Sequence, residues 1–354
     1  MKRIVLTGGG TAGHVTPHLA LLPHLLEKGY EVHYIGTKDG IERQIMSGQP
    51  VTYHAIHTGK LRRYFDWKNF SDPLRVLQGA HEASRLMKAL KPDVVFSKGG
   101  FVAVPVVWGA WRRGVPVIAH ESDLTPGLAN RISTRFAKKV AATFPECADA
   151  LGDKGVLTGT PLRPQLFSGN REQGLRMAGF SGEKPVLLMM GGSQGAQSVN
   201  KILREALPHI LPMMDVFHLC GQGNLDTALT DMPGYFQIEF INEDLPHALA
   251  SADLVLSRAG ANALCEFQAL KKPTLLIPLP RSASRGDQIL NAQSYEKRGL
   301  AHVLLQEDMT AESLIAALKK LLEQAPTLRA ALEQAPAADG TEAVLALIEQ
   351  VQKP

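Results

Sequence analysis

The sequence has few cysteines: only Cys147, Cys220 and Cys265 among 354 residues. They are far apart and form no Cys-x-x-Cys pair, which is typical of a reducing compartment and disfavours a structural zinc site. Long apolar runs are also missing, because none reaches the roughly 18–20 residues that a membrane-spanning helix needs. The chain enters its first apolar strand at Ile4–Leu6 without the charged and apolar segments of a signal peptide. These absences predict a cytosolic protein.

A strong excess of charge is lacking too, since the formal net charge is +4 and charged residues make up 20% of the chain. No dense cluster of Lys and Arg is interleaved with stacking aromatics, so we expect no nucleic acid as a partner. The mild positive charge suits ligands that carry phosphate, or an anionic surface. The sequence contains no Asp-x-Asp motif, no P-loop and no Ser-His-Asp signature. We therefore expect no metal or other cofactor, and a bound diphosphate would be neutralised by backbone amides and helix dipoles.

Each half of the chain contains a series of short apolar strands that alternate with helices. This pattern predicts an α/β protein with parallel sheets that are covered on both faces. The length alone suggests two domains of roughly 150–200 residues. The alternation of strands and helices is interrupted near Thr158–Pro164, where two prolines occur, and this predicts a hinge. We therefore expect one domain at 1–160 and a second at 161–335. The last helix, within 336–354, could pack on either domain, and we take the N-terminal one as the prediction. The strands are expected at Ile4–Leu6, Val32–Ile35, Val94–Phe96, Val117–Ala119, Val140–Ala141, Val186–Met190, Val216–Leu219, Leu254–Leu256 and Thr274–Ile277.

The first strand runs into a glycine-rich loop, Gly8–His14. Glycines let backbone amides approach a ligand closely and present a helix N-terminus to negative charge. The spacing also fits a tight turn with no ligand, and no clear ribose-binding acid follows the second strand, so a dinucleotide site is disfavoured. His14 is the residue in this loop that can accept a proton near neutral pH. The alternative is a histidine at a helix start that only bonds a backbone carbonyl.

Three further sites follow strands in the second half. The block Gly191–Ala196 repeats the strand, glycine turn and helix pattern, and Ser193 there could cap the helix or bind a phosphate. The block Ser257–Glu266 offers amides for a diphosphate and a carboxylate, Glu266, for two ribose hydroxyls. Glu266 could instead be favoured only by the helix dipole. The last block offers three polar side chains near a helix start, where ordinary capping is the alternative: Asp287, Gln288 and Asn291.

In this order, the four sites resemble the MurG family of bacterial glycosyltransferases, and the similarity runs from Gly8 to about Leu305. The resemblance implies a GT-B fold, with two Rossmann-like domains facing across a cleft. It also implies inverting transfer of N-acetylglucosamine from UDP-GlcNAc to the 4-hydroxyl of undecaprenyl-diphosphate-linked MurNAc-pentapeptide (lipid I). The product, lipid II, serves peptidoglycan and cell-wall synthesis. Such an enzyme is expected at the cytoplasmic face of the cell membrane as a peripheral protein.

The resemblance also implies the ligand-binding residues. Glu266 would bind the uridine ribose, the backbone of Ile241 the uracil, and Gln288 the sugar, with Asp287 and Asn291 near it. Arg163 would also contact the donor. The diphosphate of UDP would be held by Ser193 and by the loop Ala261, Asn262, Ala263, Leu264 and Cys265. The sugar and the acceptor diphosphate would be covered by Thr11, Ala12 and Gly13.

The sequence departs from the family at two places. Ala12 stands where the family often has a glycine, which is tolerable if the residue has a negative φ. Asp123 stands where an amide often contacts the sugar, in the segment His120–Asp123. Inversion needs one base to take the acceptor proton. His14 is the first candidate, and Asp123 and Glu121 are the alternatives.

An acceptor anchored in lipid requires a surface that meets an anionic membrane. Two stretches combine aromatic and cationic side chains, 60–70 and Trp108–Arg113, and together they hold all three tryptophans. Without the resemblance, a half-buried helix face with solvated arginines would be the simpler interpretation.

Four other functions compete with this one. UDP-GlcNAc 2-epimerases and diacylglycerol glycosyltransferases share the architecture but should lack the Gly191–Ala196 block. A non-catalytic nucleotide-sugar-binding subunit would keep the donor loops but lose the base, whereas His14 and Asp123 are both present. A Rossmann dehydrogenase is disfavoured by the two similar halves and the missing ribose acid.

Overall fold

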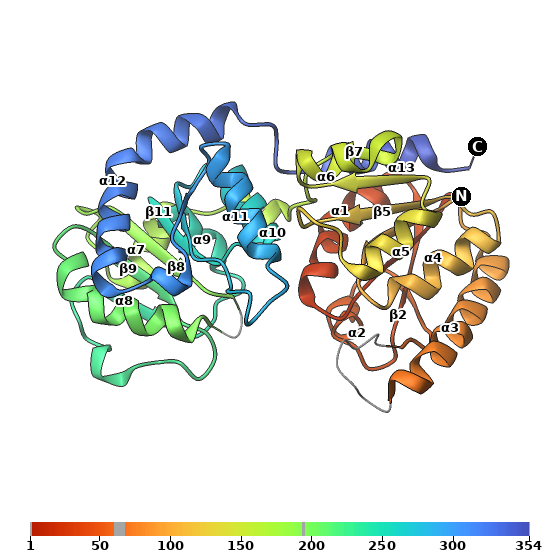
Figure 1. Cartoon of the computed structure of the whole chain (residues 1–354), viewed down its shortest axis with the longest axis horizontal. Coiled ribbons are helices and arrows are strands. Elements are labelled where there is room, and N and C mark those ends of the chain that lie inside the picture. The colour runs from red at the N-terminus through yellow and green to blue at the C-terminus, as the bar shows by residue number, and fades with distance from the viewer. Residues whose placement is uncertain (1, 60–67, 193–194, 354) are drawn as a thin grey trace. The chain divides into compact units, whose positions relative to one another are not determined.

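The computed structural model describes residues 2–59, 68–192 and 195–353 (Figure 1). The chain divides into two compact units. Unit 1 comprises Met1–Arg163 together with Asp339–Pro354, and unit 2 comprises Pro164–Ala338. The chain therefore leaves unit 1, builds unit 2, and returns to unit 1 for its last helix.

Unit 1 is built on a seven-stranded sheet with the order β3-β2-β1-β4-β5-β6-β7, in which neighbouring strands pair in parallel. This is the doubly wound order of a Rossmann fold, with crossover helices on both faces. Its strands are β1 (Lys2–Gly8), β2 (Tyr30–Gly36), β3 (Thr52–Ala55), β4 (Val94–Gly99), β5 (Val117–Glu121), β6 (Lys139–Ala142) and β7 (Gly155–Leu157).

The two faces of this sheet are buried by different helices because side chains alternate along each strand. Ile4 and Leu6 of β1 belong to a cluster that includes side chains of α1 and α13, whereas Val5 belongs to a cluster with α3 and α4. The helices of unit 1 are α1 (Thr16–Glu27), α2 (Ile41–Met46), α3 (Lys68–Leu90), α4 (Ala103–Arg112), α5 (Leu128–Phe136), α6 (Pro145–Ala150) and α13 (Thr341–Val351). Short 3₁₀ turns occur at η1 (Ala12–His14) and η2 (Gly152–Lys154).

Unit 2 repeats the same plan with a six-stranded parallel sheet of order β10-β9-β8-β11-β12-β13. Relative to its own first strand, β8, this is again the doubly wound order. The strands are β8 (Val186–Met190), β9 (Asp215–Leu219), β10 (Tyr235–Ile238), β11 (Leu254–Ser257), β12 (Thr274–Leu276) and β13 (His302–Val303).

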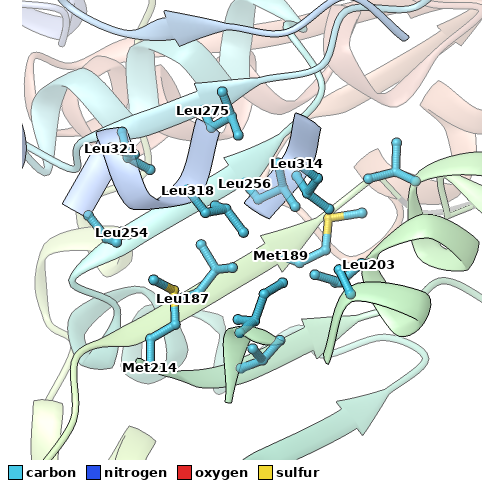
Figure 2. Packing of buried hydrophobic residues seen from close by; sticks show 14 of the residues in the cluster. Leu187, Met189, Leu203, Met214, Leu254, Leu256, Leu275, Leu314, Leu318 and Leu321 are labelled. Atoms are coloured by element: carbon cyan, nitrogen blue, oxygen red, sulfur yellow. The ribbon is translucent and has the colours of Figure 1, made fainter. Parts of the chain in front are cut away.

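One face of the second sheet is buried by α8 and α12. Leu187 and Leu256 from the sheet pack with Leu203 of α8 and with Leu314 and Leu318 of α12, and all five side chains are fully buried (Figure 2). The helices of unit 2 are α7 (Arg171–Ala178), α8 (Gln197–Ile210), α9 (Leu245–Ser251), α10 (Ala261–Ala269), α11 (Asp287–Lys297) and α12 (Ala311–Gln334). Short 3₁₀ turns occur at η3 (Pro164–Phe167), η4 (Thr227–Leu229) and η5 (Gln306–Asp308).

The expected α/β class, with two parallel sheets, is confirmed, and each expected apolar strand is present. The sequence pattern did not predict β3, β7, β10 and β13. Of these, β3 has no buried residue and β13 is only two residues long. All four lie at or near the edges of their sheets, where one or both faces meet solvent and the apolar signal is weak.

Candidate functional site

The first glycine loop lies where the strand order of unit 1 reverses, between β1 and β4. In open parallel sheets, ligands bind outside the carboxyl ends of the strands at such a point. The loop after β4 meets the first loop there: a Cβ on Gly10 would come 2.6 Å from the Phe101 ring, and one on Gly100 would collide with the Gly9 carbonyl. Both Gly10 and Gly100 also have a positive φ, so each position requires glycine for its backbone conformation as well as for lack of space. The sequence pattern did not predict a role for the second loop.

The candidate acceptor residues Thr11, Ala12 and Gly13 are exposed at this point. Ala12 begins the 3₁₀ turn η1, which leads into α1. Among the described residues that are not glycine, only Lys91 and Lys271 have a positive φ. The condition under which alanine is tolerated at position 12 is therefore met.

His14 is half-buried at the end of η1. Its Nδ1 atom lies 3.2 Å from the Gly9 carbonyl oxygen and 3.1 Å from the Thr11 hydroxyl. A carbonyl only accepts, so the Nδ1 atom carries the proton that it donates to Gly9, and Nε2 keeps the lone pair. The bond to a backbone carbonyl, which the simpler interpretation of His14 expected, thus also sets the tautomer that a general base requires.

Glu121 and Asp123 follow the end of β5 and differ in their surroundings. Glu121 is 4% exposed, and its two oxygens accept hydrogen bonds from the Asn130 amide at 2.8 Å and the Asp123 backbone at 3.0 Å. Burial raises the pKa of Glu121 to about 7. Asp123 is half-buried. Glu121 therefore holds the backbone of Asp123 in place, whereas the side chain of Asp123 is the more accessible of the two.

Lys98 is a functional candidate that the sequence analysis missed. The pairing of β1 with β4 slips by one residue here, because Thr7 pairs with Ser97 and Gly8 pairs with Gly99. Lys98 is the extra residue of this bulge, a feature that re-aims side chains and is frequent beside active sites. Its side chain is only 1% exposed. No sequence signal marks this lysine as buried, since it follows a short apolar strand as a surface lysine would.

The Lys98 ammonium is enclosed by side chains from the end of β5. Its Nζ atom lies 2.7 Å from the Nδ1 atom of His120 and 2.5 Å from the Ser122 hydroxyl. The Nε2 atom of His120 in turn lies 2.9 Å from the Gly159 carbonyl oxygen. Burial, and then the charge of Lys98, hold the pKa of His120 well below its usual value. The imidazole is therefore neutral, with its proton on Nε2.

In unit 2, the strand order reverses between β8 and β11, and the predicted donor loops follow these two strands. Gly191 and Gly192 follow β8, and α8 begins at Gln197. Ser193 and its neighbour at 194 lie outside the described residues, so the phosphate-binding role expected of Ser193 stays a prediction. Gly195 has a φ of +70° and faces the Cys220 carbonyl, which leaves no room for a side chain.

The loop after β11 leads directly into α10, whose N-cap is Gly260. Ala261, Asn262 and Ala263 form the first turn, where backbone N–H groups have no partner within the helix and can face an anion. Glu266 is the sixth residue of α10, and the first turn contains no acidic residue. A purely dipolar explanation of Glu266 is therefore disfavoured, because the dipole effect fades beyond the first turn.

The remaining donor residues lie on α11 at the end of β12. Asp287 is the first residue of this helix, directly after the N-cap Gly286, and it pairs with Arg285 at 2.7 Å. The side-chain oxygen of Gln288 accepts from the Leu279 backbone at 3.1 Å and from the Ala259 backbone at 3.3 Å. Because the oxygen of Gln288 faces these two backbone N–H groups, the side-chain nitrogen of Gln288 points away from them and can donate elsewhere. The side chain of Gln288 thus connects the loops that follow β11 and β12.

Asn291 is fully buried, and its amide donates to the Ala259 carbonyl at 3.2 Å. Its observed contact therefore supports the turn before α10. Ile241, expected to bind uracil through its backbone, lies just after β10 with its side chain buried. The Nε atom of Arg163 is buried without a hydrogen-bond partner in the described part of the chain. A buried guanidinium nitrogen of this kind costs free energy unless a ligand or water completes it.

Among residues 2–59, 68–192 and 195–353, no group of three or more His, Cys, Asp or Glu side chains is arranged to hold a metal ion. Within the same ranges, no helix is both long and apolar enough to cross a membrane.

Sequence profiles of known families match both units. Residues 4–142 match the glycosyltransferase family 28 N-terminal domain, and residues 186–350 match the glycosyltransferase family 28 C-terminal domain. A protein of Clostridium kluyveri is 53% identical over 99% of both chains, and so is one of Geobacillus kaustophilus. Both bear the name UDP-N-acetylglucosamine--N-acetylmuramyl-(pentapeptide) pyrophosphoryl-undecaprenol N-acetylglucosamine transferase. The chain belongs to the MurG family within glycosyltransferase family 28.

Solved structures agree with this assignment. The crystal structure of Acinetobacter baumannii MurG is 29% identical, has a TM-score of 0.81, and is matched over 99% of this chain and all of that one. A putative UDP-N-acetylglucosamine 2-epimerase from Listeria monocytogenes has a TM-score of 0.71 at 13% identity, with 99% of this chain and 96% of that one matched. At that identity, the likeness shows the fold alone. The GT-B architecture expected from the MurG resemblance is therefore confirmed.

Proposed function

We propose that this protein transfers N-acetylglucosamine from UDP-GlcNAc to the 4-hydroxyl of the undecaprenyl-diphosphate-linked MurNAc-pentapeptide, with inversion at the anomeric carbon. The observation that carries the proposal is the full-length identity of 53% to proteins named for this reaction. The geometry supports it, because each unit places a glycine loop at the reversal point of its sheet. The product would be lipid II, the precursor for peptidoglycan.

The donor is assigned to unit 2. The first turn of α10 provides the backbone amides for the diphosphate, together with Ser193. Glu266, on the second turn of the same helix, accepts the ribose hydroxyls, and the backbone of Ile241 binds uracil. Gln288 donates its amide to the sugar, with Asp287 beside it. Arg163, which precedes the first residue of unit 2, is also assigned to the donor, and its unpaired Nε atom supports a ligand contact.

Unit 1 is assigned to the acceptor. Thr11, Ala12 and Gly13 present the start of α1 to the acceptor diphosphate. His14 takes the proton of the attacking hydroxyl on Nε2, because its Nδ1 atom is occupied by the Gly9 carbonyl. Glu121 and Asp123 remain alternatives for the base, and the raised pKa of Glu121, about 7, suits proton transfer near neutral pH.

Inversion proceeds by a single displacement. The acceptor oxygen forms its bond to the anomeric carbon while the bond to the UDP oxygen breaks, and the hydroxyl proton goes to the base. Negative charge then develops on the leaving diphosphate. The amides at the start of α10 are held in a fixed orientation by the helix, so they would stabilise such a charge with little reorganisation as the bond breaks.

The membrane contact is assigned to the outer surface of α4 and α5. Trp111 is 54% exposed, and its ring lies 5.0 Å from that of Phe136. Beside these rings is a surface hollow of about 540 Å³, also lined by Arg135, Lys138 and Lys353. Aromatic rings beside several cations suit the headgroup region of an anionic bilayer. The stretch 60–70, the other expected contact, lies outside the part of the chain whose side chains the structure describes.

The deciding experiment is a transfer assay with labelled UDP-GlcNAc and a lipid I analogue. We expect the label to move to the acceptor lipid with a β linkage, and UDP to be released in equal amount. UDP release without labelled lipid would instead favour the epimerase class, which shares this fold. Binding of UDP-GlcNAc without turnover would favour a non-catalytic subunit.

A further inference from the structure

A fully buried carboxylate lies directly beneath the first glycine loop. Glu42 is the second residue of α2 and has no exposed surface. A buried carboxylate is costly unless several donors surround it. Glu42 is surrounded in this way: one oxygen accepts the Thr37 backbone N–H at 3.0 Å and the Thr37 hydroxyl, and the other accepts the Gly10 backbone N–H at 3.3 Å.

Three glycines leave room for this side chain. A Cβ on Gly9 would lie 2.6 Å from the Glu42 carboxylate, and one on Gly40 would collide with both the Thr37 hydroxyl and the Glu42 carboxylate. A Cβ on Gly36 would collide with the Tyr53 hydroxyl and would lie 2.9 Å from Cγ of Glu42. Neither Gly9, Gly36 nor Gly40 has a positive φ, so their backbone conformations do not require glycine. The space that Glu42 occupies is the constraint that these three positions share.

Neighbouring tyrosines reinforce the arrangement. The Tyr34 hydroxyl donates to the Gly8 carbonyl at 2.6 Å, and the Tyr53 hydroxyl donates to the Thr37 carbonyl at 2.6 Å. Burial, and then the charge of Glu42, hold the pKa of both phenols above their usual value. Both phenols therefore stay protonated and remain donors. The ends of β1 and β2 are thus joined through the Glu42 carboxylate and the Tyr34 phenol, whereas the Tyr53 phenol joins β3 to the segment after β2.

We infer that Glu42 is a positioning residue for the first glycine loop: its buried carboxylate fixes Gly10 and Thr37, and so sets where Thr11, Ala12 and Gly13 meet the acceptor diphosphate. This inference deepens the proposed function and rests on the assignment of the acceptor to this loop. Glu42 is assigned no contact with either substrate. It takes up the Gly10 amide, so that the ligand-facing amides are those that follow it.

The first test needs no substrate. Hydrogen exchange of the ligand-free full-length protein is followed in the peptide that covers 8–14, for Glu42→Gln, Glu42→Ala and the control Glu27→Gln, whose side chain is exposed on α1. We expect exchange in this peptide to be about tenfold faster in both Glu42 variants, because a loop that loses a charge-assisted bond opens more often. Exchange in Glu27→Gln should match the parent protein. Equal exchange in all four proteins would overturn the inference.

The second test uses the glycine contacts. Gly9→Ala should lower the melting temperature in the parent protein, where the new methyl meets the Glu42 carboxylate. In the Glu42→Ala background, the same substitution should cost much less, so the two effects should not add. Additive effects would show that Glu42 does not set the requirement for glycine. If Glu42→Ala does not fold, Gly9→Ala is combined with Glu42→Asp instead, whose shorter side chain withdraws the carboxylate and should likewise reduce the cost of the methyl.

The third test separates positioning from a purely structural role. In the transfer assay, Glu42→Gln should raise the KM for the lipid-linked acceptor about tenfold and leave the KM for UDP-GlcNAc unchanged. An equal rise in KM for both substrates would show that Glu42 contributes only to the general stability of the protein, and it would overturn the inference. If the parent protein transferred no sugar, the proposed function would fail, whereas the exchange and melting measurements would still decide the role of Glu42.

Discussion

The Nζ atom of Lys98 lies 2.7 Å from the Nδ1 atom of His120, deep in the first sheet. An ammonium only donates, so the imidazole accepts and stays neutral, with its other nitrogen bonded to the Gly159 carbonyl. The same ammonium bonds the Ser122 hydroxyl. A single buried cation therefore fixes the segment that carries Glu121 and Asp123.

Replacing this cation should impair turnover. We expect Lys98→Met to lower kcat for transfer about tenfold or more, because His120 and Ser122 lose a charged donor and the segment toward Asp123 loses its anchor. The Kd for UDP-GlcNAc, assigned to unit 2, should not change. Steady-state kinetics and donor titration measure both quantities. The control is Lys88→Met, an exposed lysine on α3, and equal kcat values in the two variants would contradict the prediction.

The stability of the fold should depend on pH through Glu121, whose pKa is raised from 4.5 to about 7 by burial. Below the unfolded pKa, the carboxyl is protonated in both states. As the pH rises toward 7, the unfolded chain releases the proton more readily, so the native state loses on the order of 3 kcal/mol of stability. Denaturant unfolding at several pH values should show this fall in the parent protein. Glu121→Gln should remove this pH-dependent loss of stability. If the free energy of unfolding changed with pH in the same way in both proteins, Glu121 would not be its source.

Removing the proposed base should abolish most turnover without affecting donor binding. We expect His14→Ala to reduce kcat by roughly 10²–10⁴-fold, the usual contribution of a general base. His14→Ala should also lose the acid limb of the pH–rate profile, because that limb reports protonation of the imidazole. If His14→Ala retained most of its kcat, the base would be Asp123 or Glu121 instead of His14. Asp123→Asn would then be measured in the same way.

The role of Glu266 can be tested through the ribose hydroxyls of UDP, which it is expected to bind. Glu266→Gln should weaken binding of UDP about tenfold or more, because a charge-assisted bond to the ribose is lost. The affinity for 2′,3′-dideoxyuridine diphosphate, which lacks both hydroxyls, should be the same in the variant and the parent protein. Glu296→Gln, on the exposed side of α11, serves as the control. Equal losses for the two nucleotides would assign Glu266 to another part of the donor.

Membrane contact should depend on the cations around Trp111. We expect Arg112→Glu combined with Lys138→Glu to reduce co-sedimentation with vesicles that contain anionic lipid, and to leave the low binding to neutral vesicles unchanged. The Arg62→Glu, Arg63→Glu pair tests the stretch 60–70 in the same assay. Binding that survives charge reversal in both sets would contradict the proposed surface.

The fold could be predicted from the sequence because its central strands are short, continuous apolar runs. Val94–Phe96 and Leu254–Leu256 are buried on both faces, and parallel sheets impose that pattern. Edge strands escaped prediction for the opposite reason. In β3, only half-buried and exposed residues occur, so neither alternation nor an apolar run marks Thr52–Ala55 as a strand.

The candidate site was predicted in part, and the limit has a physical cause. Loops that follow strands are marked by glycines, so Gly8–His14 and Ser257–Glu266 could be located from the sequence alone. Glu42 and Lys98 could not, since a charged residue near a glycine is usually on the surface. Their importance comes from burial, and burial of a charge depends on donors and acceptors from distant strands: Thr37 for Glu42, and His120 for Lys98.

The return of the chain to unit 1 has a consequence for its synthesis on the ribosome. Val344, Leu345 and Ile348 of α13 are buried in the same cluster as Ile4 and Leu6 of β1. When residue 163 has been made, that apolar face of the first sheet has α1 but still lacks α13, and all of unit 2 must be translated before α13 emerges. The first half of the protein is therefore the last to be completed. During translation, the part of this face that α13 will bury stays exposed, and exposed apolar surface of this kind favours aggregation until it is covered.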